Sequence, residues 1–134
     1  MSPDQPDERP LRPVIDHVGI EVTDLDASIE FYDAVFSCLG IRQVYRSANS
    51  VAYGKHSPVL WVVKRGRGPG PSFGHIAIAA AGRRAVEAAY AAGIEHGGWD
   101  NGAPGLREDY GKNYYAAYLT DPDGYRIEVV SGSH

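Results

Sequence analysis

The sequence predicts an α+β domain built from two similar halves, each with the order strand, helix and three strands. The segments "IDHVGIEV", residues 15–22, and "FGHIAIAA", residues 73–80, repeat one alternating pattern 58 positions apart. Alternation of apolar and polar residues predicts a half-buried strand, and helical spacing follows both segments. One βαβββ half buries too little apolar surface alone, so two halves must pack together or pair with a second chain.

The first half starts with the strand at 15–22. Thr23 or Asp24 is expected to cap the next helix, because both side chains accept hydrogen bonds from the free N–H groups of a first turn. Gly40 is expected to end that helix in the left-handed conformation that glycine adopts without strain. Three further short strands are predicted at 41–47, 50–55 and 58–64.

The second half follows a hinge and repeats the plan. Residues 65–72, "RGRGPGPS", are too rich in glycine and proline for regular structure and are predicted to be that hinge. A strand at 73–80 precedes a helix over 83–92, which Gly93 is expected to end. Residues 97–113 are punctuated by glycine and are predicted to be a long loop, a kind of segment that often carries function. The turn signal "DPDG" joins two hairpin strands at 114–120 and 125–130.

Length and composition describe one domain without a nucleic-acid or membrane signature. The chain has 134 residues and a formal net charge of -4, with both signs of charge spread along it. A small molecule or another protein is therefore the expected partner. Residues 1–13 are predicted to be a disordered or extended arm, and 14–134 the single domain, with module one at 14–64 and module two at 73–130. The lone Cys38 can form no internal disulfide, which favours a cytoplasmic location.

Alternation also assigns side chains to the faces of the strands. Ile127 is expected to face the helix, so its neighbour Glu128 faces the opposite, concave side. The same parity puts His17, His75 and Tyr118 on that side. Two imidazoles and one carboxylate are a ligand set for non-haem Fe(II) and for several zinc enzymes, with further positions open to water and substrate.

Three segments, "DHVGIEVTDLDASIEFY", "GHIAIAA" and "DPDGYRIEVV", resemble the vicinal oxygen chelate superfamily, which includes glyoxalase I, extradiol dioxygenases and bleomycin- and fosfomycin-resistance proteins. The resemblance covers nearly all of 14–130. It implies two βαβββ modules that form a cupped, barrel-like mixed sheet with helices on the outer face. It also implies a homodimer and a divalent metal ion bound by His17, His75 and Glu128.

The same resemblance bears on the branch of the superfamily. The glyoxalase branch has a fourth protein ligand where Trp61 stands here, and an indole has no lone pair for a metal. The extradiol branch uses two histidines and one glutamate, with a tyrosine ten residues before the glutamate, where Tyr118 stands. His56 is the counterpart of that branch's acid/base histidine in a loose alignment. The resemblance therefore implies an Fe(II) extradiol-type dioxygenase for a small aromatic or polyketide-like substrate, with Tyr118 and His56 as catalytic residues.

Other functions and structural roles stay open at this point. One alternative is a glyoxalase- or epimerase-like lyase or isomerase that uses Zn(II), Mn(II) or Ni(II). Another is a protein that sequesters an antibiotic or metabolite without chemistry. His17 also fits a packing role, and Glu128 fits a salt bridge to Arg126 or Arg107 on a solvated face. If the modules swap between chains, His17 and Glu128 of one site come from different copies.

Overall fold

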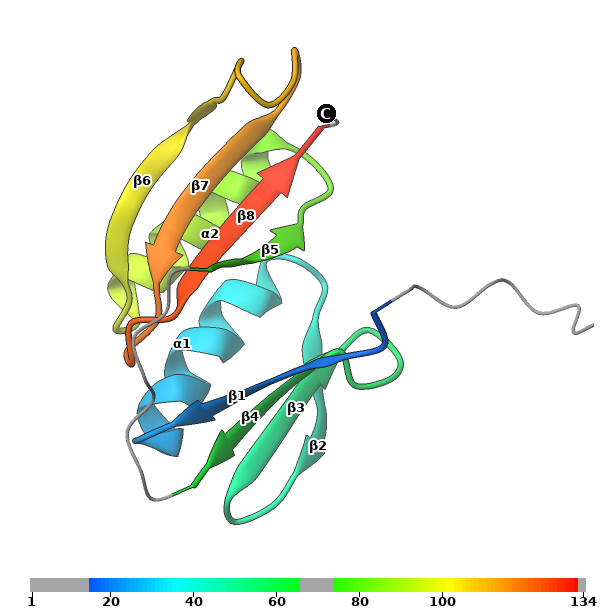
Figure 1. Cartoon of the computed structure of the whole chain (residues 1–134), viewed down its shortest axis with the longest axis vertical. Coiled ribbons are helices and arrows are strands. Elements are labelled where there is room, and N and C mark those ends of the chain that lie inside the picture. The colour runs from blue at the N-terminus through cyan, green and yellow to red at the C-terminus, as the bar shows by residue number, and fades with distance from the viewer. Residues whose placement is uncertain (1–14, 66–73, 133–134) are drawn as a thin grey trace, which may run out of the picture.

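Both halves have the predicted βαβββ order. The computed structural model describes residues 15–65 and 74–132, so the arm at 1–13 and all but the first residue of the hinge at 65–72 lie outside the described residues. No helix in the described ranges is long and apolar enough to span a membrane. The elements are β1 (Val18–Val22), α1 (Leu25–Ser37), β2 (Arg42–Arg46), β3 (Ser50–Gly54), β4 (Leu60–Lys64), β5 (Ile76–Ala79), α2 (Arg83–Glu95), β6 (Trp99–Leu106), β7 (Tyr115–Thr120) and β8 (Arg126–Ser131) (Figure 1).

Each half forms its own four-stranded mixed sheet. The strand orders are β1–β4–β3–β2 and β5–β8–β7–β6. In each sheet the first strand pairs in parallel with the last one, and the other pairs are antiparallel. The α+β class with two βαβββ modules is confirmed. Among the described residues of one chain, the two sheets stay separate and do not close into a single barrel.

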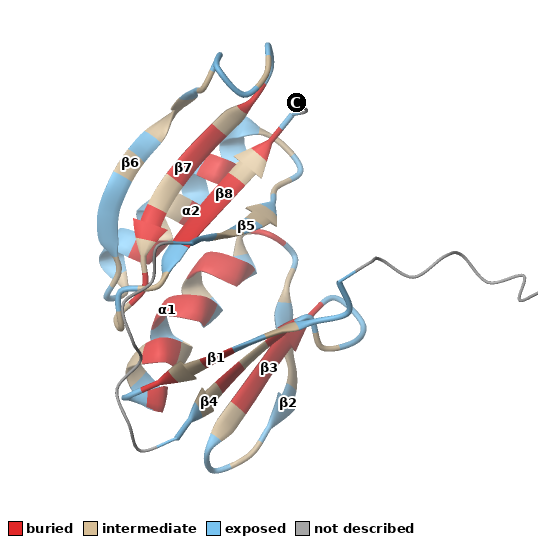
Figure 2. Ribbon diagram, viewed as in Figure 1, coloured by how far each residue is buried: buried red, intermediate tan, exposed pale blue. Residues whose placement is uncertain are grey.

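The two helices pack against each other and cover one face of each sheet. Helix α1 begins at Asp24, whose carboxylate accepts a hydrogen bond from the Ala27 N–H at 3.1 Å, as predicted. Gly40 has a φ of 72°, which confirms the predicted left-handed turn after the helix. Figure 2 shows buried residues on α1 and on the inner strands β3, β7 and β8, whereas β6 is exposed over most of its length. The core therefore lies between the helices and the sheets, and the opposite sheet faces carry the polar side chains.

Gly93 does not end the second helix, contrary to the sequence prediction. Helix α2 continues to Glu95, and Gly97, with a φ of 96°, follows the C-cap. A Cβ at Gly93 would lie 2.7 Å from Leu119 Cδ1 and 3.1 Å from a Val35 methyl group, so this buried glycine lets α1 and β7 approach α2 closely. The glycine is thus explained by tertiary packing and not by a helix end.

The first part of the predicted loop at 97–113 is instead the strand β6. It pairs antiparallel with β7, and its register shifts between Asp100 and Gly102 and again between Gly102 and Gly105. Such irregular pairing accommodates glycine and Pro104 at the edge of a sheet, where a missing N–H donor is tolerated. The alternation that predicts a regular strand is lost at each shift.

One buried and one partly buried hydrogen bond join the second module to the first. The Tyr32 hydroxyl of α1 donates to the Asp121 carboxylate at 2.6 Å, and both residues are fully buried. The Tyr125 hydroxyl donates to the carbonyl oxygen of Glu21 at 2.7 Å. Asp121 also accepts from the Tyr125 N–H, which shapes the predicted β7–β8 turn. The turn that closes the last hairpin is therefore docked where β1 meets α1.

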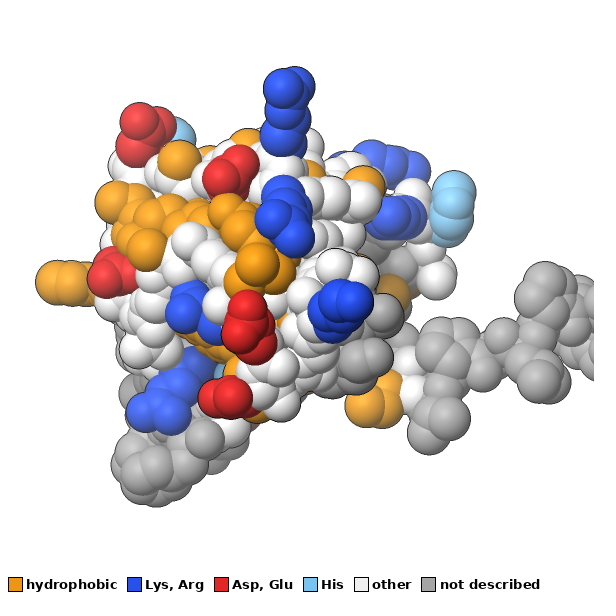
Figure 3. All heavy atoms as spheres, turned by 90° about the horizontal axis from the view of Figure 1, so that it is seen from above, with side chains coloured by type: hydrophobic (Ala, Val, Ile, Leu, Met, Phe, Trp, Pro, Cys, Tyr) orange, Lys and Arg blue, Asp and Glu red, His pale blue; other side chains and the backbone are white. Residues whose placement is uncertain are grey.

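The face of the molecule seen from above mixes acidic, basic and apolar side chains (Figure 3). Together with a net charge of only -4, this mixture gives that face no field of a single sign. The composition-based expectation of a small-molecule or protein partner is consistent with this face.

Candidate metal centre

His75 and Glu128 meet on the face of the second sheet that points away from α2. Ala77 of β5 pairs with Glu128 of β8, and His75 lies two residues before Ala77, so both side chains belong to one face. Nε2 of His75 lies 3.2 Å from Oε1 of Glu128. Glu128 is only 3% exposed, whereas the His75 side chain is 56% exposed. The carboxylate is therefore held inside the protein and the imidazole borders on solvent.

Tyr114 holds the second oxygen of the same carboxylate. Its hydroxyl donates a short hydrogen bond to Oε2 of Glu128, which leaves Oε1 toward His75. Burial, followed by this hydrogen bond, raises the pKa of Tyr114 well above its ordinary value, so the phenol is a neutral donor at physiological pH. The burial of Glu128 contradicts the alternative of a salt bridge on a solvated face.

The His75–Glu128 pair fits a divalent cation. Two ligands at right angles on an ion with bonds of about 2.1 Å are about 3 Å apart, close to the observed separation of 3.2 Å. A phenol that orients a carboxylate is also a common feature of metal sites. An ion pair between imidazolium and carboxylate has the same geometry, so the assignment depends on a third ligand.

His17 lies on the other sheet, immediately before β1. Its Nδ1 is 2.8 Å from Oδ1 of Asp16, a contact that leaves Nε2 to bind elsewhere. Among the described residues, no group of three or more His, Cys, Asp or Glu side chains is placed to hold a metal ion. One chain therefore brings together His75 and Glu128 but not His17.

Trp61 and His56 also belong to the first sheet. Trp61 pairs with Gly19 across β4 and β1 and contacts the ring of Tyr45, with ring centroids 5.2 Å apart. It therefore lies on the face of the first sheet that points away from α1. His56 is exposed in the β3–β4 loop. The end of this loop meets the start of β1, because the Val18 N–H donates to the Val59 carbonyl oxygen at 2.8 Å.

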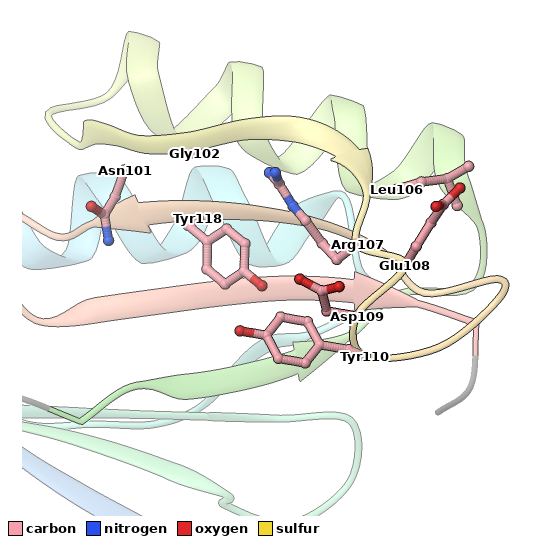
Figure 4. A pocket seen from close by; sticks show the side chains of 8 residues that line it. All are labelled: Asn101, Gly102, Leu106, Arg107, Glu108, Asp109, Tyr110 and Tyr118. Carbon is pink, nitrogen blue, oxygen red and sulfur yellow. The ribbon is translucent and has the colours of Figure 1, made fainter.

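A cavity of about 610 Å³ opens on the second sheet near Glu128, although neither His75 nor Glu128 is among the residues that line it. Its lining comes from β6, from the loop after β6 and from Tyr118 of β7 (Figure 4). Tyr118 pairs with Glu128 across the two strands, so the cavity and the carboxylate share one face of the sheet. Burial, and then the nearby Glu128 carboxylate, raise the pKa of Tyr118, so its phenol is protonated at neutral pH. The cavity is within the size range of small-molecule sites.

Two residues of this region carry roles that sequence reasoning did not find. Tyr114 has the parity of Tyr118, which predicts its face, but alternation gives no sign that its hydroxyl reaches Glu128. Arg107 lies in the predicted loop, and its guanidinium carbon is 5.2 Å from the centroid of the Tyr118 ring. The sequence offered two signals: the strand parity of Tyr114, and, for Arg107, its position in a long glycine-rich segment.

Comparisons with known proteins agree with this architecture. The family model described as the Glyoxalase/Bleomycin resistance protein/Dioxygenase superfamily matches residues 14–129. A crystal structure of a glyoxalase/bleomycin resistance protein from Albidiferax ferrireducens T118 is 32% identical, with a TM-score of 0.74 and coverage of 88% of this chain and 98% of that chain. No curated protein matches this chain.

More distant solved structures share the fold. A glyoxalase-related enzyme from Fulvimarina pelagi is 22% identical, with a TM-score of 0.70 and coverage of 90% of this chain and 88% of that chain. A mutant of the fosfomycin resistance protein FosX from Listeria monocytogenes, complexed with Mn(II) and 1S,2S-dihydroxypropylphosphonic acid, is 15% identical, with a TM-score of 0.69 and coverage of 92% and 93%. Since the family model matches most of the chain, this protein belongs to the glyoxalase, bleomycin resistance protein and dioxygenase superfamily.

Proposed function

We propose that this protein is a divalent-metal enzyme whose site is completed by two copies of the chain. His75 and Glu128 of one copy would hold the ion together with His17 of the other copy. The observation that carries the proposal is the His75–Glu128 contact of 3.2 Å, with the second carboxylate oxygen fixed by Tyr114. A buried carboxylate that a phenol orients and that an exposed imidazole approaches is well arranged for a cation arriving from solvent.

The first sheet supports the participation of a second copy. Its face away from α1 carries His17 and the contacting rings of Tyr45 and Trp61, and Tyr45 is 47% exposed. Exposed aromatic side chains beside a prospective ligand are typical of interfaces and binding sites. A dimer with two-fold symmetry would oppose the first sheet of each copy to the second sheet of the other, and would give two equivalent sites.

Each polar residue of the site has a separate role in the proposal. When bound, the metal ion would polarise the substrate oxygens that chelate it. Tyr118 would donate a hydrogen bond to a substrate oxygen, since its raised pKa keeps the phenol protonated. Tyr114 would keep Glu128 in its binding orientation. His56 would transfer a proton from the end of the first sheet that also carries His17.

The ligand set favours an Fe(II) extradiol-type dioxygenase over a glyoxalase. Three protein ligands leave open positions for a substrate that chelates through two oxygens, with molecular oxygen as the second substrate. Trp61, which offers no lone pair, stands where a fourth ligand would be needed for the glyoxalase pattern. A small aromatic diol is the substrate class that this arrangement suits.

Metal analysis followed by oxygen uptake tests the proposal. Protein purified without a histidine tag is loaded with Fe(II) under anaerobic conditions and then mixed with catechols and naphthalenediols in air-saturated buffer. Substrate-dependent oxygen consumption that is lost in His75→Ala and Glu128→Gln supports the dioxygenase. Turnover with Zn(II) or Mn(II) and without oxygen would overturn the dioxygenase in favour of a lyase or isomerase. A protein that binds no divalent metal would overturn both enzymes.

A further inference from the structure

The cavity that shares a sheet face with Glu128 is lined by an arginine that is held in place without being neutralised. Nη2 of Arg107 donates to the Ala103 carbonyl oxygen at 2.6 Å and makes a longer contact of 3.5 Å with that of Ala116. Its guanidinium also lies over the ring of Tyr118, with a distance of 5.2 Å to the centroid. Neutral carbonyl groups and an aromatic face hold the guanidinium without cancelling its charge.

The charge of Arg107 has no anionic partner among the residues that the structure describes. None of their carboxylates forms an ion pair with it, and its Nε is buried without a hydrogen-bond partner. A buried donor without a partner is uncommon and costs free energy, since the group has given up its water. An anionic oxygen group that entered the cavity would meet a preorganised cation that lacks a counter-charge.

Gly102 leaves room for the contact between Arg107 and Tyr118. A Cβ at Gly102 would lie 2.9 Å from Cδ2 of Tyr118 and 3.5 Å from Nη2 of Arg107, and its φ is 146°. A Cβ there would clash with the Tyr118 ring and would come into ordinary contact with Arg107. The glycine of β6 thus preserves the stacked pair as one wall of the cavity.

Tyr110 gives the cavity a second aromatic surface and connects it to the proposed metal ligand Glu128. Tyr110 lines the cavity and contacts the ring of Tyr114, with centroids 5.5 Å apart, and Tyr114 in turn binds Glu128. The cavity therefore offers ring surfaces for stacking at one side of the Glu128 carboxylate. A planar ring suits these surfaces better than a branched aliphatic group does.

Two carboxylates also line the cavity, and both would repel an anionic ligand. Glu108 and Asp109 are both exposed, so water and salt screen their repulsion of an anion. In Figure 4 the Glu108 carboxylate is directed away from Tyr118, whereas the Asp109 carboxylate and the Arg107 side chain both lie on the side of Tyr118. Asp109 is therefore the carboxylate that opposes an anion in the cavity, and its exposure weakens that repulsion. Arg107 is the more buried charge, so its attraction is screened less.

We propose that this cavity is the substrate subsite for a carboxylate carried on a planar ring, and that Arg107 is the residue that recognises the carboxylate. The inference rests on the proposed function, because it names the substrate class of the same site. The ring would stack between Tyr110 and Tyr118, and the guanidinium of Arg107 would donate hydrogen bonds to the carboxylate oxygens. An aromatic diol with a ring carboxylate would then be preferred to the plain diol.

Titration of metal-free protein with benzoate and benzamide tests the subsite independently of the metal. The two probes have the same ring and differ in charge, and binding is followed by the amide NMR signals of isotope-labelled protein. We expect tighter binding of benzoate, with shifts in residues 101–110 and at Tyr118. Arg107→Met should weaken benzoate binding roughly tenfold to a hundredfold and leave benzamide unchanged. Arg84→Met, which removes an exposed charge from α2, should keep the preference for benzoate.

Further outcomes make the test decisive. Arg107→Lys keeps the charge without the planar fork and should bind benzoate with intermediate affinity. Equal affinities for the two probes in the unaltered protein, or a preference that survives in Arg107→Met, would overturn the assignment. If Arg107→Met does not fold, benzoate shifts outside residues 101–110 and Tyr118 would overturn it. If the unaltered protein binds no Fe(II) but still prefers benzoate to benzamide, the metal proposal alone is contradicted.

Discussion

The orientation of one buried carboxylate decides how well the proposed metal site can bind. Tyr114→Phe removes the hydroxyl that donates to Oε2 of Glu128 while it keeps the ring. Loss of a partner that orients a ligand typically weakens metal binding, so we expect the affinity for Fe(II) or Mn(II) to fall about 10- to 100-fold. Competition with a chelator of known affinity measures this change.

A matched control for that variant is Tyr110→Phe. The Tyr110 ring contacts Tyr114, but its hydroxyl has no described bond to Glu128, so metal affinity should stay the same. Unchanged affinity in Tyr114→Phe as well would mean that the phenol does not orient a ligand.

Tyr118 and Tyr114 lie on the same face of the sheet, but removal of their hydroxyl groups is expected to affect different properties. Tyr118→Phe keeps the ring under Arg107 and removes the hydroxyl that would donate to substrate. We expect metal affinity within twofold of the unaltered protein and a turnover number lower by about 10²-fold or more, the usual contribution of a positioned proton donor. A turnover number that does not change would remove Tyr118 from the catalytic role.

At the scale of elements, the contact between α1 and the β7–β8 turn holds the modules together. Tyr32→Phe leaves Oδ2 of the buried Asp121 without its 2.6 Å donor, and we expect the free energy of unfolding to fall by about 1–3 kcal/mol. Chemical denaturation measures the change. Tyr90→Phe removes a hydrogen bond to Asp100 at the surface and should change stability by less than about 0.5 kcal/mol. Equal effects of the two variants would contradict a special role for the buried pair.

The same carboxylate predicts how stability depends on pH. Burial raises the pKa of Asp121 above its ordinary value of 3.8, although its hydrogen bonds to Tyr32 and to two backbone N–H groups act in the opposite direction. The folded state therefore binds this proton more tightly than the unfolded chain does. Stability from this group is complete below the ordinary pKa and is lost as the pH rises through the raised pKa of the folded state.

Asp121→Asn tests that pH dependence. Because Asn cannot ionise, the unaltered protein should lose stability relative to Asp121→Asn as the pH rises from about 4 to neutral. Denaturation at several pH values measures the difference in the free energy of unfolding between the two proteins. A difference that is constant with pH would contradict the raised pKa.

The glycine inside α2 is predicted to be intolerant of a methyl group. Gly93→Ala would put Cβ 2.7 Å from Leu119 and 3.1 Å from Val35, and overpacking of this kind costs about 1–3 kcal/mol. Thermal unfolding should therefore occur at a lower temperature. Gly105→Ala, whose Cβ would meet no atom closer than 4.0 Å, is the matched control. A stabilised Gly93→Ala would show that the helix gained more from alanine than the packing lost.

At the scale of the whole molecule, local sequence patterns predicted most helices and strands. They did not predict how the two modules are placed relative to each other. Alternation at 15–22 and 73–80 predicted the first strand of each module, and Asp24 and Gly40 predicted the ends of the first helix. Strand β6 was missed because its register shifts break the alternation. Gly93 was misinterpreted because glycine occurs both at helix ends and where a helix packs closely against its neighbours.

In the candidate site, too, local patterns were predictive and the docking of the modules was not. Parity on neighbouring strands is a local property, and it correctly put His75 and Glu128 on one face. The separation of His17 from this pair depends on how the two sheets are docked, which contacts such as Tyr32 with Asp121, 89 positions apart, help to fix. No alternation pattern records a contact of that kind. The joint role of the three residues in metal binding remains a prediction.

The central claim, a cation shared between copies, is tested most directly by a mixed dimer. His17→Ala and Glu128→Gln copies are given different tags without histidine, are co-expressed, and are isolated as the heterodimer for Fe(II) analysis under anaerobic conditions. Either homodimer should bind almost no Fe(II). The heterodimer keeps one intact site of two and should bind about half the metal of the unaltered dimer. A heterodimer as empty as both homodimers, or a His17→Ala homodimer that is fully loaded, would contradict the account.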